Sequence, residues 1–178
     1  MKTPLYPYHT AHGKITEFAG YQMPLYYTSA VQEVTAVRHQ AGLFDVSHMG
    51  VIEVTGDQAE AFVDFVSTNH IASKTDGSAI YTTLASLDGG CIDDVMTMRL
   101  KKTRFLIVAN AINKEKVLNH FKQESSHFQD IVLTSLFQEA GFLALQGKEA
   151  ERVLSIIPGV KNLQKHTLLS FVHPRFGE

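Results

Sequence analysis

The chain has 178 residues, 44% of them hydrophobic, so it can build one domain or two small ones around a real core. Its formal net charge of -2 excludes the basic field on which nucleic-acid-binding proteins rely. The one cysteine, Cys91, excludes an intrachain disulfide and an all-cysteine metal site, which fits a reducing compartment.

Targeting and membrane signals are missing from the sequence. Residues 1–6 lack the apolar core of a signal peptide, and no run of residues approaches membrane-spanning length. We therefore expect a soluble, cytoplasmic protein.

The first part of the chain predicts two helices with a strand between them. Valines recur at helical spacing over 29–40, and Gly42 is placed to end that helix. Residues 51–55 alternate apolar and polar side chains, which indicates a strand. Asp57 is placed to cap the second helix, which runs to about Ser67.

The second part predicts an antiparallel meander followed by a mixture of helices and a strand. Asp88 and Gly89 lie between the first two strands and are a strong hairpin signal, because glycine accepts the positive φ of tight turns. Strands and helices interspersed around hairpins predict an α+β fold of mostly antiparallel sheets with flanking helices. The expected elements are strands over 79–86, 91–100, 104–109 and 142–145, and helices from Asn113 to about Lys122 and from Gly147 through Ile156.

Side chains along the predicted strand 91–100 should alternate between two faces. Asp94 then lies as a single carboxylate in an apolar row, which consists of Ile92, Met96, Met98 and Leu100. Because a buried charge without a partner is unfavourable, Asp94 is expected to meet a donor from either a ligand or a neighbouring loop. Asp93 falls on the opposite, mixed face, where it is interpreted as a solvated or turn-bracing residue.

Other common site patterns are missing from the sequence. Neither a Gly-x-Gly phosphate pattern nor a Gly-x-x-x-x-Gly-Lys-Ser/Thr loop occurs. His9 and His12 are close, but the nine histidines form no recognisable metal motif, so surface or hydrogen-bonded histidines are expected and no metal site is predicted. Asp45, Ser47 and His48 are too close in sequence to be expected to meet as a catalytic triad.

Several segments occur in the order typical of one known family. They are Phe18–Leu25, Glu33 with Ala36–Arg38, Ala41–Gly50, Thr68 with Asn69, Gly89–Asp94, Val108–Lys116 and Ala144–Gly147. Over nearly its whole length, the chain resembles the N-terminal half of aminomethyltransferase, the T-protein of the glycine cleavage system. The Phe-Asp-Val-Ser-His-Met block and the Gly-Gly-x-x-Asp-Asp strand are highly specific to T-proteins and their folate-dependent relatives.

The resemblance implies a one-carbon transfer. T-proteins move the one-carbon unit of an aminomethyl group on the lipoyl arm of the H-protein to tetrahydrofolate, yielding methylenetetrahydrofolate, ammonia and the dihydrolipoyl carrier. Asp94 matches the family aspartate that approaches the reacting nitrogens of the folate. There it would orient the amine and stabilise a developing cation, without a covalent enzyme intermediate.

The resemblance also implies a set of tetrahydrofolate contacts. They map onto Met49, Tyr81, Met96, Met98 and Asn110. Met96 and Met98 share the face of Asp94, so a flat ring could lie along this strand, since methionine packs adaptably against aromatic systems. The alternatives are that the two methionines belong to the core and that Asn110 caps a helix.

The chain departs from the family pattern at several positions. Tyr21 stands where the family usually has a tryptophan, which is a mild change. Met98 stands where an aromatic residue is common, which would loosen contacts with a ring. Lys148 and His70 stand where a proline and an aspartate are often found.

The family's fold is a three-lobed ring around a central folate channel, and this chain would supply part of the wall. The resemblance predicts a partial first lobe from 1–49 plus 138–178, and an inserted α+β lobe over 50–137 that carries the Gly-Gly-x-x-Asp-Asp strand. The family's C-terminal domain and its Arg-x-Gly-Tyr-Thr-Gly-Glu motif lie beyond Glu178, so weaker binding of folate and carrier is expected. Exposed apolar surface would favour self-association or a complementing second chain.

Two functions follow as hypotheses. The first is a folate-dependent aminomethyltransferase with Asp94 as its key side chain. The second is a truncated, non-catalytic folate- or protein-binding module that needs a second chain for activity. A third, a folate-binding relative that serves iron–sulfur protein maintenance, ranks lowest because its Lys-Gly-Cys-Tyr-x-Gly-Gln-Glu motif is missing from the sequence.

Overall fold

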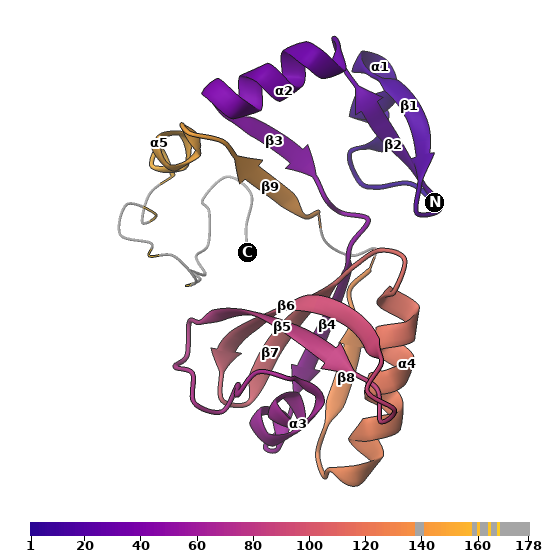
Figure 1. Ribbon diagram of the computed structural model, residues 1–178, viewed down its shortest axis with the longest axis vertical. Coiled ribbons are helices and arrows are strands. Elements are labelled where there is room, and N and C mark those ends of the chain that lie inside the picture. Colours follow the sequence, from indigo (N-terminus) through magenta and orange to yellow (C-terminus); the bar gives the residue numbers. More distant parts are fainter. Residues whose placement is uncertain (138–140, 158–159, 161–163, 165–166, 168–178) are drawn as a thin grey trace.

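The computed structural model describes residues 1–137 and 141–157 and the single positions 160, 164 and 167. Figure 1 shows the elements in two groups, one drawn above the other. The chain passes from the first group to the second where β3 (Gly42–Asp45) is followed by β4 (Gly50–Thr55).

The first group gathers segments from both ends of the described chain (Figure 1). Besides β3 it holds α1 (Tyr6–His12), β1 (Lys14–Phe18), β2 (Tyr21–Tyr26), α2 (Ala30–His39), β9 (Leu143–Gln146) and α5 (Ala150–Leu154). β1 and β2 form an antiparallel hairpin. β3 pairs antiparallel with β9, from Gly42 opposite Gln146 to Asp45 opposite Leu143, so the chain leaves this group after β3 and returns to it through β9.

The second group is a five-stranded antiparallel sheet with two helices. The strand order is β5-β6-β7-β4-β8, and every neighbouring pair is antiparallel. A short 3-10 helix, η1, follows the second helix. Besides β4, the elements are α3 (Ala59–Val66), β5 (Ala79–Ala85), β6 (Cys91–Lys101), β7 (Arg104–Ala109), α4 (Lys114–Glu124), η1 (Ser125–His127) and β8 (Val132–Ser135).

The main core lies between this sheet and the helices α3 and α4, which pack against one of its faces. Phe62 of α3 and Phe121 of α4 meet edge to face, with ring centroids 5.5 Å apart. The burial of these apolar side chains is the principal favourable term in the folding of this group. The core comprises Ile52, Val54, Ala59, Phe62, Val63, Val66, Ile71, Ile80, Leu84, Ile92, Val95, Phe105, Ile107, Ala109, Val117, Leu118 and Phe121.

The predicted α+β architecture with mostly antiparallel strands is confirmed. The helix predicted over 29–40 is α2, the strand over 51–55 is β4, and the predicted meander is β5, β6 and β7. The strand predicted over 142–145 is β9, and the helix predicted from Gly147 is the shorter α5. Local periodicity was therefore sufficient to identify most of the longer elements.

Two predicted helix boundaries need correction, and a third is right in position. Gly42 does not end α2 but begins β3, because β9 supplies a partner strand there. Gln58, rather than Asp57, occupies the N-cap of α3, and its side chain accepts a hydrogen bond from the backbone N–H of Gln129 at 2.6 Å. Asn113 does stand at the N-cap of α4, but its side chain turns to an aspartate of β6.

The short elements α1, β1, β2, β3 and β8 were not predicted. The β1–β2 turn places Ala19 at φ 49 and Gly20 at φ 79, so both residues are left-handed. An Ala-Gly pair is only a weak sequence signal for such a turn. β8 exists because β4 offers it an edge, with Ile52 opposite Ser135. Elements of this length are decided by their partners rather than by their own residues.

Three further features bear on the function classes considered above. Within the described ranges, no helix combines the length and the apolar character needed to cross a membrane. Among the same residues, no group of three or more His, Cys, Asp or Glu side chains is placed to hold a metal ion. Cys91 is exposed at the start of β6.

Candidate functional site

Residues that were assigned to the site by resemblance lie together on the face of the five-stranded sheet opposite the core. Tyr81 lies opposite Met96 in the β5–β6 pairing, and cross-strand partners point to the same face. Ile80 and Val95, their neighbours in sequence, are buried and point to the helices. We call this surface the open face, defined by Met49, Tyr81, Asp94, Met96, Met98 and Asn110.

Met49 and Asn110 reach the open face from the ends of two strands. Gly50, the first residue of β4, is paired with Ala109, the last residue of β7. Met49 directly precedes that pair and Asn110 directly follows it. The structure thus brings these two residues from separate connections to one end of the sheet, where Asn110 contacts Asp94.

Asp94 is exposed on the open face and is held by two neighbours. The hydroxyl of Tyr81 donates a hydrogen bond to Asp94 Oδ2. Asn110 Nδ2 lies 3.1 Å from Asp94 Oδ1 and 3.0 Å from its backbone oxygen. The expected donors are present, but the expected apolar burial is wrong, since Asp94 is exposed and Tyr81 beside it is 61% exposed.

Asp93 is the buried member of the pair, so the interpretation that it is solvated is wrong, while the interpretation that it braces a turn holds for the turn 110–113. It is 2% exposed. Its carboxylate accepts hydrogen bonds from Asn110 N at 2.8 Å, Asn110 Nδ2 at 2.9 Å and Asn113 Nδ2 at 2.7 Å. These three donors satisfy the buried charge, as the cost of burying it requires.

The predicted alternation along β6 is right, but the face assigned to the core is wrong. From Asp93 onward the mixed row points inward, because its charged members Asp93 and Arg99 find partners there. Arg99 is one such member and forms ion pairs with Glu60 at 2.5 Å and Asp76 at 2.8 Å. A bulge at the start of β6, where Leu84 lies opposite Asp93 but Ala85 lies opposite Cys91, leaves Ile92 buried as well.

Asn110 bridges the two aspartates and does not cap a helix. Its side-chain N–H₂ group contacts Asp93 and Asp94, while its backbone oxygen accepts from the N–H of Asn113 at 2.9 Å. The turn 110–113 therefore holds one buried and one exposed carboxylate in a fixed relation. Met96 and Met98 are half-buried on the open face, so the alternative that they are core residues does not hold.

A second polar network, which sequence reasoning did not identify, lies in the first group. His9 Nε2 and Asp45 Oδ2 are 2.7 Å apart, with both side chains 1% exposed. Tyr27 Oη contacts the other ring nitrogen of His9 at 2.8 Å, and Ser47 Oγ donates to Asp45 Oδ1 at 2.5 Å. Asp45 thus pairs with a distant histidine and not with His48, which agrees with the expectation that Asp45, Ser47 and His48 form no triad.

The electrostatics of this network follow from burial and hydrogen bonding. Burial alone raises the pKa of Asp45, but the hydrogen bonds from His9 and Ser47 outweigh it and leave the pKa below its usual value. Burial lowers the pKa of His48; the charge of Lys114 lowers it further, and Asp45 opposes both. The segment that leads to Met49 therefore carries an ionised Asp45 and, at neutral pH, an uncharged His48.

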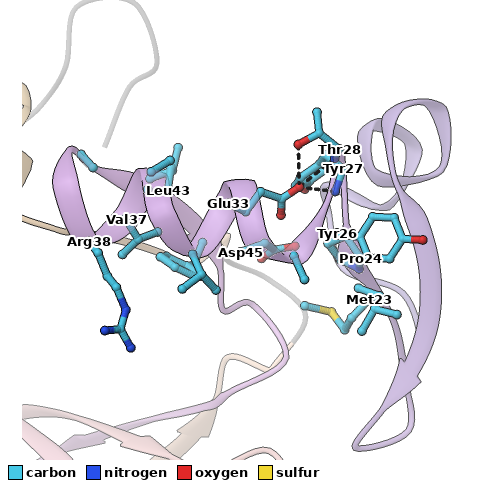
Figure 2. A pocket seen from close by; sticks show the side chains of 17 residues that line it. Met23, Pro24, Tyr26, Tyr27, Thr28, Glu33, Val37, Arg38, Leu43 and Asp45 are labelled. Carbon is cyan, nitrogen blue, oxygen red and sulfur yellow. Dashed lines mark hydrogen bonds between the residues drawn. The ribbon is translucent and has the colours of Figure 1, made fainter.

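A cavity of about 660 Å³ lies in the first group, and none of the open-face residues lines it. Figure 2 shows the side chains along this cavity. Glu33 of α2 closes one side, where its Oε1 accepts from the backbone N–H groups of Tyr27 at 2.7 Å and Thr28 at 2.8 Å. The side chains labelled along this cavity are Met23, Pro24, Tyr26, Tyr27, Thr28, Glu33, Val37, Arg38, Leu43 and Asp45. Their mixture of aliphatic and hydrogen-bonded polar groups differs from the open face, where a hydroxyl and an amide converge on an exposed carboxylate.

Two known aminomethyltransferases illustrate what this chain is similar to in sequence. An aminomethyltransferase of Thermotoga petrophila is 43% identical over 154 residues, which cover 86% of this chain and 42% of that protein. An aminomethyltransferase of Pseudothermotoga lettingae is 38% identical over 172 residues, which cover 96% of this chain and 47% of that protein. The chain therefore spans about half the length of the curated relatives that it matches.

A solved structure and a family model agree with these relatives. The crystal structure of glycine cleavage system aminomethyltransferase T from Bartonella henselae superimposes with a TM-score of 0.87 at 34% identity, over 94% of this chain and 46% of that one. The family model of the GCVT N-terminal domain matches residues 5–175. The resemblance inferred from the sequence is thereby confirmed, and the chain belongs to the family of the GCVT N-terminal domain, the N-terminal part of glycine cleavage aminomethyltransferases.

Proposed function

We propose that this chain supplies the tetrahydrofolate-facing wall of a glycine cleavage aminomethyltransferase. In the proposed reaction, the carbon of an aminomethyl group loses its bonds to the lipoyl sulfur of an H-protein and to the amine nitrogen, and gains two bonds to tetrahydrofolate nitrogens. The two protons that these nitrogens lose pass to the sulfur and to the leaving amine. The products are methylenetetrahydrofolate, ammonia and the dihydrolipoyl carrier. The observation that carries the proposal is the convergence of Asp94, Tyr81 and Asn110 on the open face.

Asp94 is the proposed catalytic residue. Its exposed carboxylate is available to accept a hydrogen bond from a folate amine and to stabilise positive charge that develops on the reacting carbon and nitrogen. Tyr81 and Asn110 hold that carboxylate, so less reorganisation is needed when the charge appears. Catalysis here is positioning and electrostatics.

The chemistry of the open face fits tetrahydrofolate as co-substrate, which supplies the nitrogens that receive the one-carbon unit. Met96 and Met98 give a flat, polarizable strip along β6, suited to contact with a ring system. At the end of this strip, the carboxylate of Asp94 and the amide of Asn110 are available to the edge of a folate ring, which carries both hydrogen-bond donors and acceptors. Met49 would close the strip at the start of β4.

A second function is favoured by the exposure of the site. Asp94 is exposed, Tyr81 is 61% exposed, and the chain spans 42% to 47% of its relatives' length. These facts favour a folate- or protein-binding module that becomes active only with further polypeptide over the open face, supplied by a second chain or through self-association. In either case we propose a lipoylated H-protein as the partner and the cytoplasm as the location.

Calorimetric titration with tetrahydrofolate tests the proposal. Asp94→Ala and Met98→Ala should each raise the dissociation constant about tenfold, because each removes a direct contact. Asp57→Asn, an exposed acidic position at the start of α3, is the matched control and should leave the dissociation constant unchanged.

The enzyme and the module are then separated by an activity assay with aminomethylated H-protein. Turnover by this chain alone supports the enzyme. Folate binding without turnover supports the module. No heat of binding from a folded sample would overturn the enzyme and the folate-binding module, and would leave the protein-binding module.

A further inference from the structure

A hydrogen bond crosses between the two groups of elements next to the proposed site. Lys114, the first residue of α4, is 5% exposed, and its ammonium donates to Tyr21 Oη of β2 at 2.6 Å. Tyr21 is itself 2% exposed. A buried ammonium is stable only where hydrogen bonds and favourable electrostatics replace its water, so this contact is a constraint on how the two groups are placed.

Aromatic rings and a glycine shape the path of the lysine. The ammonium lies 4.6 Å from the centroid of the Tyr21 ring and 5.0 Å from that of Phe137, within the range of cation–π attraction. A Cβ placed on Gly50 would come within 2.4 Å of Lys114 Cβ and 3.2 Å of the Phe137 ring. The stem of the lysine therefore passes directly over the first residue of β4, in a channel that only glycine leaves open.

Each end of this hydrogen bond adjoins a segment of the proposed site. On one side, Lys114 follows the turn 110–113, whose amides hold Asp93 and Asp94. On the other side, the ring of Tyr21 lies against that of His48, with centroids 6.3 Å apart, and Met49 is the next residue. The bond thus connects the two open-face segments that lie outside the β5–β6 hairpin.

We propose that Lys114 is a positioning residue, which through Tyr21 sets Met49 and Asn110 at the correct separation for tetrahydrofolate. The inference rests on the proposed function. It concerns Lys114 and Tyr21, which act on the folate site through Met49 and Asn110 and do not contact the folate themselves. Met96 and Met98, which are anchored within β6, should not depend on the bond. The inference therefore predicts which parts of the open face move when the bond is removed.

The test uses Tyr21→Phe, Lys114→Met, the double variant and, as a matched control, Lys116→Met on the exposed side of the same helix. Tyr21→Phe leaves the ammonium without its acceptor and should lower stability. The double variant removes both partners and should recover most of it. The affinity for tetrahydrofolate should fall about tenfold in Tyr21→Phe and in the double variant, because neither variant restores the native separation of Met49 and Asn110. Affinity that recovers together with stability in the double variant would show a merely structural pair and overturn the inference.

A second readout does not depend on folate binding. Methyl NMR of the five native methionines should show the Met49 signal shifted in Tyr21→Phe and in the double variant, where Lys114→Met adds a sixth signal, with Met96 and Met98 unchanged. A Met49 signal that is unshifted in these variants would overturn the positioning role of Lys114, whatever their affinity for folate. If the wild type binds no folate, the proposed function fails, while the methyl spectra still decide whether Lys114 sets the position of Met49.

Discussion

At the scale of single residues, Asp93 and Asp94 show how neighbouring carboxylates take opposite tasks. Asp93 is buried and fully engaged by three amide donors, so its charge serves to hold the turn 110–113. Hydrogen bonds to a charged group each contribute about 1.5–3 kcal/mol, enough to offset its desolvation. Asp94 keeps contact with solvent, so its charge stays available to a ligand.

Alanine substitutions should separate these two tasks. Asp93→Ala leaves Asn110 N and Asn113 Nδ2 without their acceptor and should lower the free energy of unfolding by about 3 kcal/mol. Asp94→Ala removes an exposed side chain and should change it by less than about 0.5 kcal/mol. Urea unfolding measures both, and equal losses in the two variants would contradict the assignment.

The buried Asp45 predicts a particular response to acid. Because its folded-state pKa is lowered, its contribution to stability is complete above its unfolded pKa of about 3.9 and is lost as the pH falls through the folded value. Asp45→Asn should therefore lower stability at neutral pH and flatten the decline below about pH 4. Urea unfolding across this range measures the slope, with Asp57→Asn as the exposed control. A decline parallel to that of the wild type would refute the assignment.

At the scale of elements, local patterns predicted what a segment's own residues decide and missed what distant partners decide. The turn at Asp88 and Gly89 predicted the β5–β6 hairpin, because the positive φ that it requires is met by Gly89 itself. The core face of β6 was misassigned because Asp93 and Arg99 are buried against partners from other elements.

The same distinction holds for the candidate site. Alternation along the strand 91–100 singled out Asp94, whereas the other five residues were assigned through the family resemblance, and the roles of all six stay proposals. Lys114 and Tyr21 are separated by 93 positions in the sequence, and His9 and Asp45 by 36 positions. No rule of sequence spacing predicts contacts between residues so far apart.

Two glycines with positive φ should respond differently to alanine. Gly89 has φ 85 and no described atom within 4 Å of an added Cβ, so Gly89→Ala carries only backbone strain of about 1 kcal/mol. Gly56 has φ 133, and its Cβ would lie 1.6 Å from the backbone oxygen of Asp130. Gly56→Ala should therefore cost about 3 kcal/mol or more, because the loop before β8 must move. Thermal unfolding compares them, and equal losses would contradict the steric argument.

At the scale of the whole molecule, the core residues named above all lie between 52 and 121. We propose that 50–137 is a lobe inserted into a first lobe formed by 1–49 and 138–178. Residues 138–140 and most positions after 157 lie outside the described ranges. The separate core and the antiparallel sheet give the proposed lobe its own source of stability.

This division predicts that a fragment of residues 50–137 folds alone. It should unfold cooperatively in urea, because it keeps α3, α4 and all five strands of the sheet. A fragment of residues 50–109 is the control, since it lacks α4 and β8 and should show no cooperative transition. A gradual, non-cooperative transition of the 50–137 fragment would mean that the first group is needed for folding.

The pairing of β3 with β9 has a consequence for synthesis on the ribosome. β3 emerges early, and its partner follows only after the entire five-stranded sheet has been translated. In that interval the sheet and its helices complete a core of their own, while β3 waits with an unpaired edge. Leu43 and Phe44 remain 63% and 42% exposed even after pairing, so the waiting strand presents apolar side chains to other nascent chains. The speed of translation across 50–137 thus sets how long this strand stays open to aggregation.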